Sequence, residues 1–187
     1  DANNALVGYG LSMVTLYYLR RYLLFLKELF NECSESKFTI SKEVYLLFNE
    51  IHSIINSINQ NKEKAFDAKC RKDFVDKLGI AASDYRTQIY KKGFSGARQD
   101  VSRDKIIEFS YTCLNVIDDT IEVNKRTDGL YNSYNILHLS SDGMSVSNLY
   151  EMLEGQVAIL SSGYLNADQS IDLLKALKSL FGMFTML

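Results

Sequence analysis

Proline is absent from all 187 residues of the sequence. At an average usage of about 5%, roughly nine prolines would be expected in a chain of this length. Proline interrupts helix interiors, because its ring removes a backbone N–H and clashes with the preceding turn. A chain without proline is free to form long helices joined by short connections. We therefore expect a fold made mostly of helix.

Apolar residues recur at steps of three and four along most of the chain, which is the pattern of a buried helix face. The pattern predicts six helices, over about residues 16–30, 41–58, 66–92, 102–123, 145–163 and 166–181. Residues suited to cap helix termini flank these stretches: either Thr39 or Ser41, Ser102, either Ser145 or Ser147, and Asn166 at N-termini, and Gly93 at a C-terminus.

The segments between the predicted helices are short. Residues 94–101, FSGARQDV, are expected to form a loop, and Tyr134–Leu139 a short extended piece ahead of a turn at SSDG. Short connections place neighbouring helices antiparallel. The sequence thus predicts an all-α fold of five to seven antiparallel helices, either a bundle or part of an α/α toroid. It predicts a single domain over residues 1–187, a fragment of a longer protein, because the final GMFTML is apolar.

Charge and composition argue against several functional classes. The net charge of −2 provides no basic footprint for nucleic acid. The apolar first helix is interrupted by Arg20, Arg21 and Lys27, so it lacks the roughly 18 uncharged residues that a membrane span needs. The three cysteines are far apart, and neither histidine lies near one at a metal-ligand spacing. We expect a soluble cytoplasmic protein without a metal site.

The sequence contains no complete catalytic or cofactor-binding motif. Asp118, Asp119 and Glu122 form the densest acidic group, and such carboxylates can act as acid and base or hold a metal. Because apolar Ile117 and Ile121 lie on the adjoining helix face, we interpret the acids as the solvated side of an amphipathic helix. The acids of LYEMLEGQ receive the same interpretation. No cofactor is expected, the catalytic residues are unknown, and the sequence leaves open whether the protein is an enzyme.

NKRTDGLYNSYN, residues 124–135, allows two interpretations. Asp-Gly is a turn signal, and the two tyrosines can anchor a connection between helices. Tyrosine faces also stack on sugar rings, while Asn, Asp and Arg supply directional hydrogen bonds to hydroxyls. We expect an ordered loop with its large rings packed on the core. The residues predicted to bind a ligand are Arg126, Asp128, Tyr131, Tyr134 and Asn135.

NKRTDGLYNSYNIL, together with ALVGYGLSMVTLYYLRRYL near the start, resembles segments of large, uncharacterised bacterial proteins of the gut Bacteroides type. Those proteins are related to the six-hairpin glycosidase-like group of carbohydrate-processing α/α toroids. The resemblance implies a non-catalytic or incomplete part of a carbohydrate-processing protein, with a saccharide as partner. The alternative is a helical protein–protein interaction or oligomerisation domain, in which the first helix or the apolar C-terminus binds a second copy or the rest of a longer chain.

Overall fold

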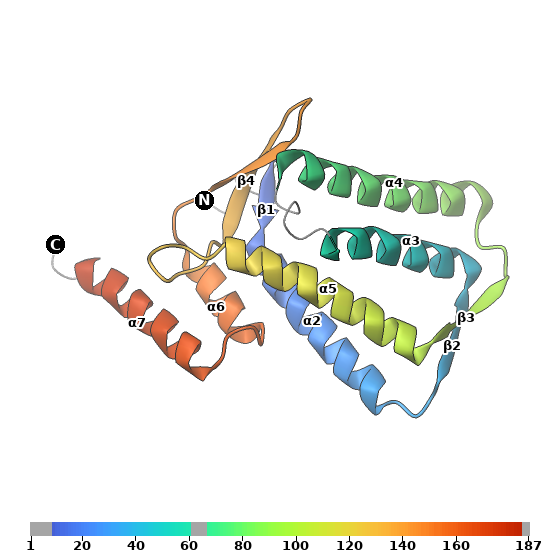
Figure 1. The fold of residues 1–187 in the computed structure, drawn as a ribbon, viewed down its shortest axis with the longest axis horizontal. Helices are drawn as coiled ribbons and strands as arrows, with labels where there is room; N and C mark the ends of the chain where they lie inside the picture. The colour runs from blue at the N-terminus through green and yellow to red at the C-terminus, as the bar shows by residue number, and fades with distance from the viewer. Residues whose placement is uncertain (1–8, 61–66, 185–187) are drawn as a thin grey trace. The chain divides into compact units, whose positions relative to one another are not determined.

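The computed structural model describes residues 9–60 and 67–184, with side chains described as far as Leu180. Phe66, the predicted start of the third helix, and the side chains of the apolar C-terminal GMFTML lie outside the described residues. The described residues form six helices and five short strands (Figure 1). By contacts, the chain divides into two compact units. Unit 1 combines the described residues up to Tyr22 with Ile117–Leu139 and the residues from Ser145 on, and unit 2 combines Leu23–Val116 with Ser140–Met144.

The prediction of an all-α fold, as a bundle or part of an α/α toroid, is wrong, because the described residues include two small sheets. The first sheet has the strand order β1 (Gly10–Ser12), β4 (Tyr134–Leu139), β5 (Met144–Asn148). Strand β1 pairs antiparallel with β4, so that Ser12 lies opposite Tyr134. The extended segment predicted at 134–139 is therefore confirmed as β4, and the amide of Ser140 donates to the carbonyl of Gly143 at 3.0 Å in the turn that follows.

The second sheet lies in unit 2 and includes the last part of the loop predicted at 94–101, so that residues 94–97 form a loop as predicted and residues 98–101 belong to a strand. Strand β2 (Lys37–Ser41) pairs antiparallel with β3 (Arg98–Ser102). The Thr39 hydroxyl donates to the Asp100 carboxylate across the pair at 2.8 Å. The two segments are about 60 residues apart in the sequence, and β3 is mostly polar and exposed. Its sequence lacks the alternation of apolar residues that predicts a strand, because pairing rather than burial stabilises it.

Unit 2 contains helices α3 (Lys42–Asn59), α4 (Ala68–Lys92) and most of α5 (Arg103–Val123), together with the C-terminal part of α2 (Met13–Glu32). Three predicted caps in this unit are confirmed. The Ser41 hydroxyl accepts from the Val44 amide at 3.4 Å, and the Ser102 hydroxyl accepts from the Lys105 amide at 3.3 Å. Gly93 ends α4 at a φ of +69°. None of the described helices is long and apolar enough to cross a membrane.

Unit 1 contains the N-terminal part of α2, the end of α5, and helices α6 (Leu153–Ser161) and α7 (Ala167–Phe184). Its core is built from large side chains that are almost fully buried: Tyr17, Ile121, Leu130, Ile159 and Leu173. The predicted cap of α7 is confirmed as a reciprocal pair. The Asn166 side chain accepts from the Gln169 amide at 2.9 Å, and the Gln169 side chain accepts from the Asn166 amide at 2.9 Å.

Helix α6 begins later than predicted. Ser145 and Ser147 lie in strand β5, and the residue at the N-cap position is Met152, whose side chain makes no capping bond. A serine from elsewhere in the chain replaces the missing cap. The hydroxyl of Ser133, in the 124–135 segment, accepts from the Gly155 amide at 2.8 Å. A cap supplied by a residue more than 20 positions away has no local sequence signal.

Candidate functional site

The segment NKRTDGLYNSYN is an ordered loop between α5 and β4. The amide of Arg126 donates to the carbonyl of Leu130 at 2.8 Å, and Lys125 forms an isolated bridge with Tyr131. Gly129 has a φ of +83°, where a side chain would be strained. Asp128 accepts from the amide of Leu130 at 3.0 Å. The predicted Asp-Gly turn is therefore confirmed, with its acidic side chain bonded across the turn.

Both tyrosines of the loop point into the core of unit 1. Tyr131 is 3% exposed and Tyr134 is 9% exposed. The backbone of Tyr131 is held from both sides by the buried side chain of Gln156 in α6. The Tyr131 amide donates to Gln156 Oε1 at 2.9 Å, and Gln156 Nε2 donates to the Tyr131 carbonyl at 2.7 Å. The expectation that these rings pack on the core is therefore confirmed, and neither ring offers an exposed face on which a sugar could stack.

Asn135, another residue predicted to bind a ligand, is also buried. Its Nδ2 donates to Asn124 Oδ1 at 2.7 Å. Asn132 Nδ2 donates to the Asn124 carbonyl at 3.0 Å, and the carbonyl of Asn132 accepts from the Tyr17 hydroxyl at 2.9 Å. Among the described residues, Asn135 Oδ1 has no hydrogen-bond partner. The amides thus tie the two ends of the loop together and anchor the loop to α2.

Arg126 and Asp128 are the two predicted site residues that lie near the surface. Arg126 Nη2 lies 2.8 Å from Asp128 Oδ2 and 3.1 Å from Glu151 Oε2. Burial alone would raise the pKa of the Asp128 carboxyl, but hydrogen bonds from Arg126 and from the Leu130 amide outweigh it and hold that pKa below its usual value. Asp128 is therefore ionised near neutral pH and cannot serve as a general acid there.

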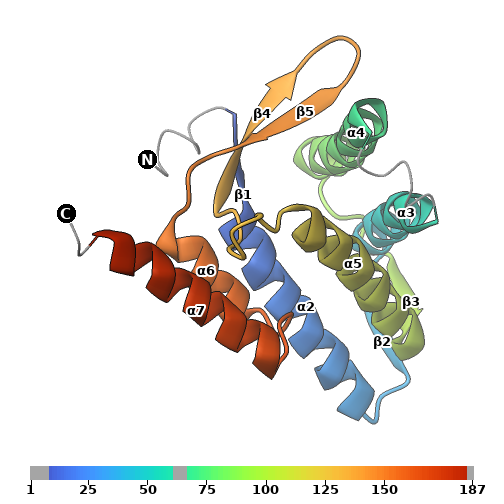
Figure 2. The same cartoon turned by 60° about the vertical axis from the view of Figure 1, so that its left-hand side comes forward.

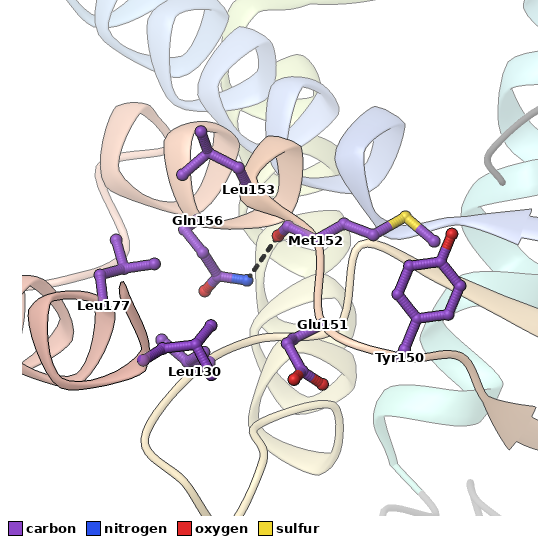
Figure 3. A pocket seen from close by; sticks show the side chains of 8 residues that line it. Leu130, Tyr150, Glu151, Met152, Leu153, Gln156 and Leu177 are labelled. Atoms are coloured by element: carbon purple, nitrogen blue, oxygen red, sulfur yellow. Dashed lines mark hydrogen bonds between the residues drawn. The ribbon is translucent and has the colours of Figure 1, made fainter. Parts of the chain in front are cut away.

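A pocket of about 270 Å³ lies beside this cluster in unit 1. Figure 3 shows the Gln156 amide directed between Leu130 and Leu177, with the Glu151 carboxylate and the Tyr150 ring farther along the pocket. The side-chain amide of Gln156 is already hydrogen-bonded within the protein, since Nε2 also donates to the Met152 carbonyl at 3.0 Å. The lining is mainly apolar and consists of Leu130, Tyr150, Glu151, Met152, Leu153, Gln156, Leu177 and Leu180.

Of the pocket residues with polar or aromatic side chains, sequence reasoning missed Tyr150 and considered Glu151 only as a solvated acid. Tyr150 is 59% exposed and lines the pocket. Its ring is therefore accessible to a ligand, unlike the buried rings of Tyr131 and Tyr134. The interpretation of Glu151 as a solvated helix acid is wrong, because Glu151 precedes α6 and binds Arg126. No local pattern could show the contact of Glu151 with the loop, since it is an ion pair between positions 25 residues apart.

The acidic residues of α5 serve mainly as structural contacts. Asp118 Oδ1 accepts from Arg20 Nε at 2.6 Å, and Arg20 Nη1 also donates to the Ser162 carbonyl. Glu122 accepts from the Tyr164 hydroxyl at 3.0 Å. Burial, and then the hydrogen bond to Glu122, raises the pKa of Tyr164 well above its usual value. The interpretation of these acids as merely solvated therefore misses two tertiary contacts within unit 1.

No group of three or more metal-ligating side chains occurs within the part of the chain that the structure describes. Cys113 is buried, Cys33 and Cys70 are half-buried, and all three are free thiols. No family model and no curated protein matches the chain. The case for a function therefore depends on the chemistry of the pocket and on the surfaces of the described helices.

Proposed function

We propose that unit 1 binds a saccharide at the pocket formed by Tyr150 and Glu151, and that it does so without catalysis. The observation that carries the proposal is the placement of an exposed tyrosine ring beside a carboxylate fixed by Arg126. An aromatic face packs against the C–H face of a sugar, while a fixed carboxylate accepts hydrogen bonds from sugar hydroxyls. The resemblance of two sequence segments to carbohydrate-processing bacterial proteins points to the same class of ligand.

The size and polarity of the pocket favour a single sugar ring. Its volume of about 270 Å³ is slightly below the roughly 300–1,000 Å³ of pockets for drug-sized ligands. Leu130 and Leu177 supply the apolar lining, and Glu151 Oε2 is oriented by Arg126. Polar groups held in place by neighbours lose little conformational entropy on binding. The predicted contribution of Arg126 and Asp128 is then to position Glu151, with no direct stacking by Tyr131 or Tyr134.

Both carboxylates of the cluster bind the same guanidinium, and this supports a binding role over an acid–base role. A glycosidase needs one carboxylic acid that stays protonated near the working pH and can donate a proton. Despite its partial burial, hydrogen bonds from Arg126 and from the Leu130 amide hold the pKa of Asp128 below its usual value. Asp128 therefore accepts hydrogen bonds near neutral pH and has no proton to donate, and Glu151 Oε2 accepts a hydrogen bond from Arg126.

Calorimetric titration of the whole chain with a panel of mono- and oligosaccharides tests the proposal. Tyr150→Ala is expected to abolish measurable binding, and Glu151→Gln to weaken it about tenfold, because the charge-assisted hydrogen bond is lost. Tyr111→Ala is the matched control, since Tyr111 is exposed to a similar extent on α5. The proposal fails if no saccharide binds, or if Tyr150→Ala and Tyr111→Ala bind it equally well.

A further inference from the structure

Helix α2 presents a second apolar face in addition to the one that packs in the core. Figure 2 shows α2 as one continuous helix. Met13, Tyr17 and Leu23 are buried on its inner side. A separate row of large apolar side chains is between 46% and 56% exposed, and it consists of Tyr18, Tyr22, Phe25 and Leu29. A helix with an uncovered row of this kind is suited to packing against another element.

The spacing of the exposed row identifies the element that fits it. The four residues follow one another at steps of four, three and four, which is the repeat of a two-helix coiled coil. Over two such repeats the row drifts by only about 20° per heptad, so all four side chains remain on one face. The complementary surface is therefore another helix with the same repeat.

Charged and apolar residues flank the row in a pattern that selects the partner. Arg21 and Glu28 lie on one flank, seven residues apart, and Leu19 and Leu26 lie on the other. Arg21 and Glu28 are both exposed, and neither forms an ion pair with another described residue. One flank thus carries a positive charge toward its N-terminal end and a negative charge toward its C-terminal end.

Two copies of α2 side by side in opposite directions satisfy this pattern. When Tyr22 packs in a layer with Phe25 of the second copy, Tyr18 meets Leu29 of the second copy. Like flanks face each other in an antiparallel pair, so Arg21 then lies opposite Glu28 of the second copy, and Leu19 lies opposite Leu26. The charge pair occurs twice because the interface is symmetric. A parallel pairing would instead set Arg21 against Leu26 and leave the charges without partners.

We propose that the exposed row on α2 is a self-association surface, and that its partner is a second copy of this chain in antiparallel orientation. The inference goes beyond saccharide binding and uses none of the pocket residues. It gives the oligomerisation alternative a named surface, a partner and an orientation. The apolar row provides the driving force for association, while the two Arg21–Glu28 pairs select the direction of the partner helix.

Sedimentation equilibrium of the whole chain over a concentration series tests the proposal. We expect a reversible monomer–dimer equilibrium. Arg21→Glu alone and Glu28→Arg alone each place like charges opposite one another twice, so each should raise the dissociation constant about tenfold. The double variant Arg21→Glu with Glu28→Arg reverses both partners and should restore the dimer. Raising the salt concentration should reduce the difference between single and double variants, because exposed charges are screened.

Matched variants make the outcome decisive. Phe25→Ala should raise the dissociation constant about a hundredfold, since it removes a large apolar side chain from two layers. Arg86→Glu, a charge reversal at an exposed residue of α4, should leave the dimer unchanged. A monomer at every concentration would overturn the proposal. A dimer that survives Phe25→Ala, or that the double charge swap fails to restore, would overturn it as well. Circular dichroism of each variant confirms that its helices are intact.

Discussion

Two connections that flank helices have a similar composition. The first is NKRTDGLYNSYN, residues 124–135, and the second is GFSGARQDVS, residues 93–102. Each contains at least one cation, a turn glycine, and aromatic and amide side chains. The first is buried from Leu130 through Asn135, whereas in the second only Val101 is buried and Phe94 is 56% exposed. Each lies in a different unit, so the contrast reflects the local partners of each connection.

The two connections differ in the groups that form hydrogen bonds with their backbones. In the first connection, Gln156 from α6 binds the Tyr131 backbone twice, and Ser133 caps α6 in return. In the second, strand β2 pairs with residues 98–102, and the Glu43 carboxylate accepts from the amide and the hydroxyl of Ser95 at 2.9 and 2.5 Å. Both connections therefore have backbone partners, but those of the first include the buried side chain of Gln156, whereas β3 pairs at the surface, where water can also satisfy polar groups.

The largest expected effect comes from removing one aromatic ring from each connection. Tyr131→Ala leaves a cavity in the core of unit 1 and should cost about 3–5 kcal/mol, or roughly 6–20 °C in melting temperature. Phe94→Ala removes an exposed ring and should change stability by less than about 0.5 kcal/mol. Thermal unfolding followed by circular dichroism measures both. Equal melting temperatures for the two variants would remove the contrast between the connections.

Gln156→Leu removes the hydrogen bonds that hold the first connection to α6. Leucine has a similar size but cannot bond the Tyr131 amide and carbonyl, which would stay buried and unpaired. We expect a loss of about 3 kcal/mol, since each unsatisfied buried group costs about 1–3 kcal/mol. Gln99→Leu, in exposed strand β3, is the control and should be nearly neutral. Chemical denaturation gives the two free energies of unfolding. The account fails if Gln156→Leu is as stable as the control.

Gly155→Ala tests how closely α6 approaches the first connection. An added Cβ would lie 2.3 Å from Ser133 Oγ and 2.9 Å from Ser133 Cα, so the two segments must move apart. We expect a loss of about 1–3 kcal/mol. Gly79→Ala in α4 meets no atom within 4 Å and should instead stabilise the chain by about 0.5–1 kcal/mol, because alanine favours helix. Opposite shifts in melting temperature are the expected result, and shifts of the same sign would contradict it.

The smallest effect is a dependence on pH that the two connections share. Hydrogen bonds from Ser95 lower the pKa of Glu43, and those from Arg126 and Leu130 help to lower that of Asp128. A carboxyl whose pKa is lower in the folded state contributes stability above its unfolded pKa and loses it as pH falls through the folded one. Stability should therefore decline below about pH 4. Denaturation at a series of pH values should show a weaker decline in Asp128→Asn than in Asp104→Asn, an exposed control.

Local patterns predicted the helices and most of their caps, because Ser41, Ser102, Gly93 and Asn166 act within three or four residues of their own positions. The burial of the loop tyrosines also followed from the size of their rings. The strands β2 and β3 could not be read in this way, since each is defined by a partner far away in the sequence. For the same reason Gln156, Ser133 and Glu151 carried no local signal, although they determine how the candidate site is built.

We infer that α6 holds the 124–135 loop rigidly, and that this loop supports the pocket instead of being a mobile binding segment. Hydrogen exchange at individual amides tests this inference. The Tyr131 amide donates to the buried side chain of Gln156, so we predict slow exchange, similar to that of the buried amides of α6. The exposed Gly96 in the second connection should exchange fast. Exchange at Tyr131 as fast as at Gly96 would contradict the account.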